Sequence, residues 1–396
     1  MRRKSVLVCG LGIAGAALAR CLAGDGFDVT VVERASALRD DGYMIDLWGV
    51  GYDAAERMEL LPALRPVGYE IEKVRMVDSD GRRVGGFDGS VLRSALGGRF
   101  FSAMRGDLVR TLSDGIAQRA HCRFGDRVVR IEQTTDVVMV EFERGATEFF
   151  DLVIGADGAH STVRELTFGP GRPSFETYLG YVAAAFRADA YEPRDDGVYV
   201  SYTEPGRHIG RYALRDGGSA FFFIFEAPQR PDRVLGDRVA QRALLQEHLG
   251  QSGWEAAAIG GALAHCDSFY FDAVSQVRIP TWSRGRVALV GDAAYGPSLL
   301  AGEGAALAMA GAYTLARELR RPGISHRVAF ANYEGALRPG IELRQRAARR
   351  HGAWFAPHTR LGLTLRNRAS RLLDRPAIAR YALTGGSANL LSAVDS

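Results

Sequence analysis

The stretch Val6–Arg34 constrains the fold of this chain more than any other. An apolar run is followed by Gly10, Gly12 and Gly15 in the G-x-G-x-x-G spacing, then by a helical segment and a second apolar run that ends in an acid. The three glycines suit a tight turn, a close approach of the backbone to a pyrophosphate, and the packing of a helix on a strand. This order of features predicts a βαβ unit that binds a dinucleotide.

The residues after the glycine turn complete the predicted site. A helix that begins near Ile13 would direct its first backbone amides, at Ile13 and Ala14, and the positive end of its dipole at the pyrophosphate. Glu33 follows about 20 residues later, where a carboxylate accepts hydrogen bonds from a ribose, and Arg34 adjoins it. The alternative is a glycine-rich turn that binds nothing, and it leaves Glu33 without a role. The motif alone does not distinguish NAD from FAD.

Length and composition exclude several classes of protein. A chain of 396 residues exceeds one hydrophobic core, and its 47% hydrophobic and 24% charged residues are typical of a globular protein. A net charge of +4 favours no nucleic-acid partner. No apolar run reaches the roughly 20 residues of a membrane span, and the basic Met1–Lys4 leads straight into a strand, unlike a signal peptide. The four cysteines form no C-x-x-C pair, so we expect a reduced, cytoplasmic setting.

Strand and turn patterns predict an α/β fold (α+β overall) with a discontinuous first domain. Residues 1–170 and 266–340 would form a Rossmann-like dinucleotide-binding domain, and residues 171–265 an antiparallel substrate-binding sheet. A helical C-terminal segment, residues 341–396, would brace both. Among the elements outside the second sheet, we expect strands at Ile71–Asp78, Arg82–Phe87 and Phe149–Ile154, and helices at Gly106–Ala120 and Gly302–Arg320.

Two later motifs bear on which dinucleotide is bound. Asp151–Arg164 is a buried strand followed by Asp157-Gly158 and an arginine, Arg164. Arg286–Gly304 places Gly291-Asp292 at a strand end, then Pro297, then the turn Gly302-Glu303-Gly304 that opens a helix.

The three motifs, in this order and spacing, resemble the single-component flavoprotein aromatic hydroxylases of the para-hydroxybenzoate hydroxylase type, the class A flavoprotein monooxygenases. The resemblance covers roughly the whole chain and is far more specific than one glycine turn. Gly42–Leu47 and Gly291–Gly311 are also similar to the tetracycline-inactivating and antibiotic-tailoring branch of that family.

The resemblance implies FAD as the cofactor and assigns residues to it. The glycine turn would hold the pyrophosphate, Glu33 the adenosine ribose and Asp292 the ribityl chain. Arg105 would reach back to the FAD, and Asp157, braced by Arg164, would position both FAD and a pyridine nucleotide. The isoalloxazine would face Pro297 and the amides near Gly302, Gly304 and Ala305. Taken singly, the two aspartates could be caps or turn residues, and Arg105 a surface arginine.

Two positions depart from the family pattern. Ala305 and Ala306 stand where relatives often have Asn or Thr, which leaves backbone amides for the pyrimidine edge of the flavin. Tyr295 stands where many relatives have His, so contacts near the ring are expected to differ.

The resemblance implies a monooxygenase that uses NADPH or NADH as a transient co-substrate. It would hydroxylate an aromatic or enolic polycyclic small molecule with dioxygen through a flavin C4a-hydroperoxide, in natural-product tailoring or antibiotic inactivation. No second G-x-G-x-x-G follows a strand, which agrees with a nicotinamide that docks only transiently. We expect a monomer or weak homodimer.

The residues that act on the substrate are less well defined. No acid or base is identified, but Arg207, His208 and Arg211 are candidates to polarise a phenol or enol, unless they are surface charges. His160 and His265 show no metal-ligand spacing, so no metal site is expected.

Three other functions stay open. The first alternative is a flavin-dependent oxidase or reductase of the same fold that inserts no oxygen. A second alternative is an FAD-binding regulatory or assembly protein without turnover. The third is a nicotinamide-only dehydrogenase, which would purify without flavin.

Overall fold

A computed structural model describes residues 3–23, 26–38, 43–169, 175–189, 191–375, 377–379 and 391. Its first sheet has six strands, parallel except for the edge strand β17. In spatial order these are β17 (Ser283–Arg284), β18 (Val287–Leu289), β11 (Leu152–Gly155), β1 (Lys4–Cys9), β2 (Phe27–Glu33) and β7 (His121–Phe124). Val6, Leu7 and Val8 are fully buried, as expected of a strand covered on both faces. The predicted βαβ unit is therefore confirmed.

A second sheet has seven strands. In spatial order these are β16 (Tyr270–Val277), β12 (Glu176–Ala188), β15 (Ser219–Glu226), β14 (Arg207–Ala213), β13 (Val198–Glu204), β4 (Lys73–Val77) and β5 (Arg83–Asp88). All neighbours pair antiparallel except β13 and β4, which are parallel. The sheet is wider than the expected range 171–265, because the early hairpin β4–β5 and the later strand β16 join its two edges.

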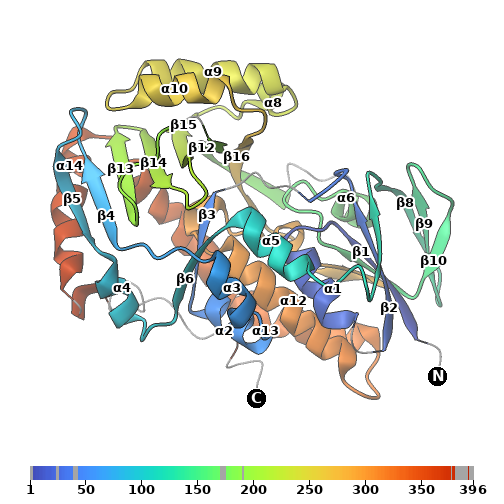
Figure 1. Ribbon diagram of the computed structural model, residues 1–396. Helices are drawn as coiled ribbons and strands as arrows, with labels where there is room; N and C mark the ends of the chain where they lie inside the picture. The colour runs from blue at the N-terminus through green and yellow to red at the C-terminus, as the bar shows by residue number, and fades with distance from the viewer. Residues whose placement is uncertain are drawn as a thin grey trace.

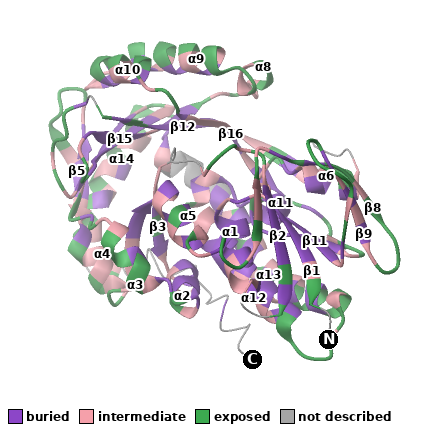
Figure 2. Cartoon of the chain, turned by 45° about the vertical axis from the view of Figure 1, so that its right-hand side comes forward, coloured by how far each residue is buried: buried purple, intermediate pink, exposed green. Residues whose placement is uncertain are grey.

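Helices cover the outer face of the seven-stranded sheet. They are α8 (Asp232–Leu235), α9 (Arg238–Gly250) and α10 (Ala256–Ala264), which lie above the sheet in Figure 1. Leu245, Leu249 and Ile259 of these helices pack against Phe221 and Phe223 of β15 in one buried cluster. Figure 2 shows the outward faces of α9 and α10 exposed, while the strands beneath them are buried. This layer leaves only the inner face of the sheet free for a ligand.

A small ribbon and several helices lie between the two sheets. Strands β3 (Met44–Trp48) and β6 (Phe100–Met104) pair antiparallel. Met44 and Met104 of this ribbon contact Leu214 and Ala220 of the large sheet. The remaining helices of the described chain up to Arg320 are α1 (Ile13–Leu22), α2 (Val50–Arg57), α3 (Leu61–Leu64), α4 (Gly89–Ala95), α5 (Arg105–Ser113), α6 (Thr162–Phe168), α11 (Asp292–Tyr295) and α12 (Gly304–Arg320).

A third sheet explains why one predicted strand is wrong. Strands β8 (Val128–Gln133), β9 (Val138–Phe142) and β10 (Glu148–Phe150) form a separate antiparallel sheet. The stretch Phe149–Ile154, expected as one strand, is divided at Asp151 between β10 and β11 of two different sheets. Asp151 accepts hydrogen bonds from the backbone and the hydroxyl of Ser5, at 2.8 and 3.0 Å, which fixes the crossing point.

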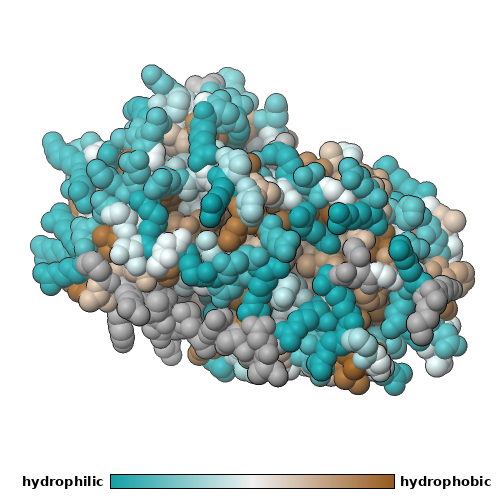
Figure 3. Space-filling model, turned by 60° about the horizontal axis from the view of Figure 1, so that its bottom comes forward, coloured by the Kyte–Doolittle hydropathy of each residue, from teal (hydrophilic) through white to brown (hydrophobic). Residues whose placement is uncertain are grey.

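The C-terminal part is helical where the structure describes it. Helix α13 (His326–Phe355) crosses the molecule beside α12, and α14 (Arg360–Ser370) packs on β5 (Figure 1). Residues 376, 380–390 and 392–396 of the predicted C-terminal segment lie outside the described residues. On the face drawn in Figure 3, polar side chains predominate and apolar ones form small groups. No helix in the described part of the chain has the length and apolar character needed to cross a membrane.

Candidate active site

The three sequence motifs meet because their strands are neighbours. β1, β11 and β18 lie side by side in the order β18-β11-β1 and run parallel. The glycine turn, Asp157 and Asp292 each follow the carboxyl end of one of these strands. Ligands of open parallel sheets bind at this edge. The structure therefore brings together residues that lie up to about 280 positions apart in the chain.

The glycine turn is built for close approach. Gly10 has a φ of +99°, which favours glycine. A Cβ on Gly15 would lie 1.9 Å from the carbonyl oxygen of Gly10, so helix α1 packs directly on the turn. At Gly12 a Cβ would meet only the Arg105 Nη2 atom, at 3.9 Å. Gly12 is the N-cap of α1 and supplies no side-chain cap, so the first amides of the helix, at Ile13 and Ala14, have no side-chain acceptor at this cap.

Glu33 lies at the end of β2, where the sequence places it, and it contacts the glycine turn directly. Its carboxylate accepts hydrogen bonds from the backbone amides of Leu11 and Ala35, both at 2.8 Å. These bonds hold the turn in place beside the second strand. Arg34 is exposed.

Arg164 fastens the second motif to the third. Its guanidinium is buried and donates hydrogen bonds to the carbonyl of Ala293, at 3.0 Å, and to that of Ala159, at 2.7 Å. Asp157 accepts from the Ser161 hydroxyl at 2.5 Å and from the Val163 amide at 3.1 Å. Burial raises the pKa of Asp157, and these hydrogen bonds oppose that shift.

Asp292 opens the third motif and faces a cation. Its side chain is accessible to solvent, yet the surrounding protein raises the pKa of its carboxyl, and the charge of Arg105 opposes this rise. Arg105 also lowers the pKa of Tyr43, which burial raises to about 12. Because the Arg105 guanidinium also lies beside Gly12, it spans the distance from the glycine turn to Asp292. An accessible carboxyl deep inside the protein marks a cleft at this point.

The loop from Pro297 to Gly304 leads into α12. Pro297 and Ser298 are buried, and Ser298 has a φ of 89°, a conformation that costs a non-glycine residue energy. Gly302 is exposed with a φ of +68°. Helix α12 then begins at Gly304 with no side-chain cap, so the first amides of this helix, like those of α1, have no side-chain acceptor at the cap. A Cβ on Gly304 would lie 4.0 Å from an oxygen of Asp292.

The structure locates the two departures from the family pattern. Tyr295 points away from the cleft, because its ring lies 4.5 Å from that of Trp282 and its hydroxyl lies 3.2 Å from that of Tyr333. It fills space that Gly311 leaves open. Ala306 is buried against Gly51, whereas Ala305 is half-buried at the start of α12.

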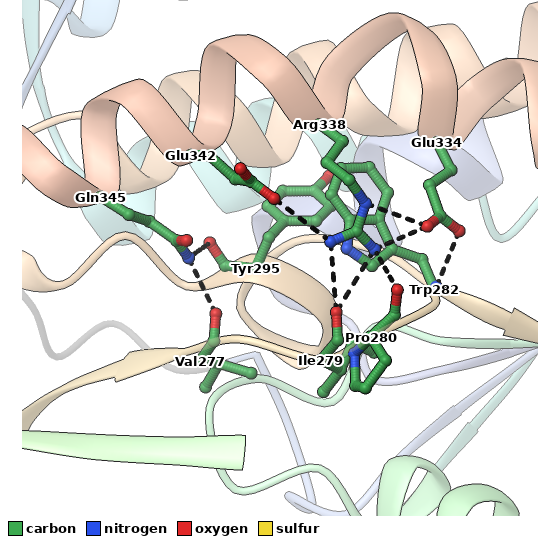
Figure 4. A network of polar contacts seen from close by, with 9 residues as sticks. All are labelled: Val277, Ile279, Pro280, Trp282, Tyr295, Glu334, Arg338, Glu342 and Gln345. Atoms are coloured by element: carbon green, nitrogen blue, oxygen red, sulfur yellow. Dashed lines mark hydrogen bonds and ion pairs between the residues drawn. The ribbon is translucent and has the colours of Figure 1, made fainter. Parts of the chain in front are cut away.

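Helix α13 holds the same loop from behind (Figure 4). The side-chain amide of Gln345 donates to the carbonyls of Val277 at 2.8 Å and Tyr295 at 3.1 Å. Arg338, on the same helix, pairs with Glu334 and donates to the carbonyl of Ile279. The end of β16 and the loop after Asp292 are thus attached to one rigid helix.

The three substrate-side candidates do not share a face, which corrects that grouping. Arg207 donates to the carbonyl of His248 on α9, and Arg211 pairs with Glu255 at 2.9 Å and also with Asp195. Successive side chains of a strand point to opposite faces, so His208 alone points to the inner face. It contacts Phe222 there, with ring centroids 6.3 Å apart.

Several residues of the cleft lie outside the three sequence motifs. The ring of Tyr43 lies 5.7 Å from that of Phe222 and 5.5 Å from that of Tyr270. Asp46, on β3, is accessible although burial raises the pKa of its carboxyl. The stretch Gly42–Leu47 carried the signal for both Tyr43 and Asp46, although Gly42 itself lies outside the described residues. These rings gather at the inner face of the large sheet, where the charges of Asp292 and Arg105 act on Tyr43 and Tyr270.

Comparisons with known proteins agree with this geometry. The family described as "FAD binding domain" matches residues 103–322. A flavin-dependent monooxygenase from an unknown prokaryotic organism is 34% identical over 350 residues, which cover 86% of this chain and 88% of that protein. The chain belongs to this family of FAD-dependent monooxygenases.

Two further proteins show how far the likeness extends. An FAD-dependent monooxygenase of Sarocladium schorii is 32% identical to this monooxygenase over 361 residues, covering 86% of this chain and 85% of that protein. The crystal structure of the tetracycline destructase Tet(51) superposes with a TM-score of 0.81 at 30% identity, covering 95% of this chain and 97% of that chain. The predicted resemblance, fold class, enzyme class and cofactor are confirmed.

The residues present fit FAD. The uncapped amides at the start of α1 and the open space at Gly12 suit a pyrophosphate. The accessible carboxyl of Asp292 suits the hydroxyls of a ribityl chain, and the uncapped start of α12 suits an electron-rich ring edge.

Proposed function

We propose that this monooxygenase hydroxylates an aromatic or enolic polycyclic small molecule, in natural-product tailoring or antibiotic inactivation. The aromatic cluster of Tyr43, Phe222 and Tyr270 carries the proposal, because it lines the inner face of the large sheet beside the accessible Asp292. Flat ring systems pack well against such rings. The likeness to a tetracycline destructase supports a substrate of several fused rings.

We also propose which residues hold the cofactor. Gly10, Gly12 and Gly15 with the amides of Ile13 and Ala14 would bind the pyrophosphate, and Glu33 and Arg34 would lie at the adenosine end. Arg105 and Asp157 would contact FAD between its two ends, Asp292 would bind the ribityl chain, and Pro297, Gly302, Gly304 and Ala305 would face the ring. When bound, FAD supplies hydride acceptance from NADPH or NADH and the activation of dioxygen.

The protein's own residues then have three tasks. The start of α12 would direct its positive dipole end at the edge of the bound ring, where it would stabilise negative charge. Arg164 and Gln345 keep the loop after Asp292 in one position. The buried cluster around Phe222 and Tyr270 excludes water from the reacting atoms.

Domain organisation, location and assembly belong to the same proposal. Residues 1–170 and 266–340 would form the cofactor domain. Residues 171–265 would form the substrate sheet, to which the hairpin β4–β5 and strand β16 add the two edges, and residues 341–396 would brace both domains. A cytoplasmic protein, as a monomer or weak homodimer, has direct access to reduced nicotinamide. The four free cysteines agree with a reducing compartment.

The test is an assay for oxygen insertion. Protein loaded with FAD is given NADPH or NADH and a panel of polycyclic phenols, with tetracycline first, under isotopically labelled dioxygen. We expect one labelled oxygen atom in the product. Oxidation of the nicotinamide without label in any product would instead support an oxidase or reductase.

A further inference from the structure

Four polar side chains form a chain of hydrogen bonds on the inner face of the large sheet. Arg366 of α14 donates to the Thr203 hydroxyl at 3.2 Å. That hydroxyl lies 3.1 Å from His208 Nδ1, and His208 Nε2 lies 3.2 Å from the Tyr199 hydroxyl. Arg366, Thr203 and His208 are buried, whereas Tyr199 is half-buried. The chain therefore runs from a buried cation to a phenol at the edge of the cleft.

The cation sets the direction of the protons along this chain. Burial lowers the pKa of His208 to about 3, and the charge of Arg366 adds to the shift, so the imidazole is neutral and has one N–H. Thr203 accepts from Arg366, and its own hydrogen is then free for His208 Nδ1. A positive charge on that side favours the lone pair on Nδ1. The proton therefore lies on Nε2, and His208 donates to the oxygen of Tyr199.

Tyr199 consequently keeps its own hydroxyl proton for another acceptor. Gly210 makes room for the phenol, since a Cβ there would lie 2.0 Å from the Tyr199 oxygen. Burial raises the pKa of Tyr199, and the negative charge of Asp46 adds to this rise. The ribbon that carries Asp46 packs against the large sheet through Met44 and Met104, so the two groups lie on facing elements. Asp46 accepts from the Ser102 hydroxyl at 2.5 Å through one oxygen, and no other described residue donates a hydrogen bond to its side chain.

We propose that His208 is a positioning residue that holds Tyr199 as a hydrogen-bond donor to the substrate, with Asp46 as the facing acceptor. The pair selects a ring system with a carbonyl or enolate oxygen for Tyr199 and a neighbouring hydroxyl for Asp46. This inference rests on the proposed function, because it names the oxygen pattern of the same polycyclic substrate. The aromatic cluster packs against the substrate, and the polar contacts of Tyr199 and Asp46 fix the orientation of the substrate's rings.

The first experiment determines the tautomer of His208 without any substrate. The protein, loaded with FAD, is labelled with heavy nitrogen in histidine, and His208→Gln identifies the signals of this residue. We expect a neutral imidazole with its proton on Nε2 from about pH 5 to about pH 9. A proton on Nδ1, or titration of His208 within this range, would overturn the proposal.

The second experiment measures binding in the oxidised holoenzyme. The probe is tetracycline, or the panel compound that gains label, and its dissociation constant is read from the flavin absorbance. Tyr199→Phe is expected to raise this constant about tenfold, the effect of one lost hydrogen bond. His208→Phe is expected to do the same, and the double variant to be no worse than either, because His208 acts through Tyr199. Asp46→Asn is expected to weaken the probe to a similar extent.

Two controls separate orientation from structure. Tyr202 is on the same strand as Tyr199, but its ring packs in the outer cluster under the helices. The substitution Tyr202→Phe should therefore leave the dissociation constant unchanged. His208→Gln, whose amide also donates a hydrogen bond, should restore most of the affinity lost in His208→Phe. Additive effects of the single variants, or an unchanged constant in Tyr199→Phe, would contradict the proposal. If no panel compound binds, the proposed function is contradicted. The tautomer measurement separately tests whether His208 donates its hydrogen bond to Tyr199.

Discussion

At the scale of single residues, Gly12 and Gly15 have different tasks although they belong to one motif. Gly12 has an ordinary φ of −80° and open space around it, so the protein alone tolerates a side chain there. A Cβ on Gly15 would collide with the carbonyl oxygen of Gly10, so that position is needed for the fold itself. The pair therefore separates cofactor binding from folding.

We predict that Gly12→Ala leaves the thermal stability of the apoprotein unchanged and weakens FAD binding by at least about 100-fold, equal to about 2.7 kcal/mol. Gly15→Ala should lower the unfolding temperature of the apoprotein itself. Calorimetry and fluorescence titration with FAD measure the two quantities. Equal loss of apoprotein stability in both variants would show that Gly12 is not reserved for the cofactor.

At the scale of elements, the sequence predicts the strands and helices whose formation depends on residues close together in the chain. The βαβ unit, the hairpin β4–β5 and helix α12 follow from periodicity and turn residues, and the structure places them within a few residues of the expected bounds. The helix expected at Gly106–Ala120 ends early, at Ser113, because Gly115 has a φ of +73°. The joining of β4 to β13 depends on partners far apart in the chain, which periodicity does not contain.

The candidate site was predictable to a similar degree. The cofactor residues lie in motifs with fixed spacing, and the structure brings those motifs together. Tyr199 lies in no such motif, and the stretch Gly42–Leu47 does not reveal that Asp46 faces it, because the ribbon β3–β6 must first pack under the large sheet. Arg207 and Arg211 were grouped with His208 because sequence proximity on a strand does not reveal which face is covered by helices.

Helix α13 supports a prediction about its contact with the cofactor loop. Gln345→Leu leaves the buried carbonyls of Val277 and Tyr295 without this donor. We expect a loss of about 2 kcal/mol in the free energy of unfolding and weaker FAD binding, because the loop after Asp292 loses its support. Gln251→Leu, at an exposed position, is the matched control for chemical denaturation. Unchanged FAD binding in Gln345→Leu would mean that the loop does not depend on α13.

At the scale of the whole molecule, one polar pair that joins the first sheet's loops to the large sheet is sensitive to pH. His160, in the loop after β11, lies 3.1 Å from Asp272 on β16. The hydrogen bond to Asp272 raises the pKa of His160 in the folded protein. The pair therefore stabilises the fold fully below the unfolded-state pKa of about 6.5, and this contribution is lost as the pH rises through the folded-state pKa.

We expect His160→Gln to be less stable than the parent protein near pH 5.5 and equal to it near pH 9, with a difference below about 1 kcal/mol because the pair is partly exposed. Urea unfolding at both pH values measures this. His265→Gln, at an exposed histidine that contacts the Gly261 carbonyl of its own helix, is the matched control. A deficit that grows with pH would contradict the assigned direction.

A crystal structure of the FAD-loaded protein would show whether FAD lies across the edge where β1, β11 and β18 end. We expect electron density for the pyrophosphate at the first amides of α1, for the ribityl chain beside Asp292, and for the ring facing Tyr43 and Phe222. FAD density at another place, or a pyrophosphate remote from Gly12, would contradict it.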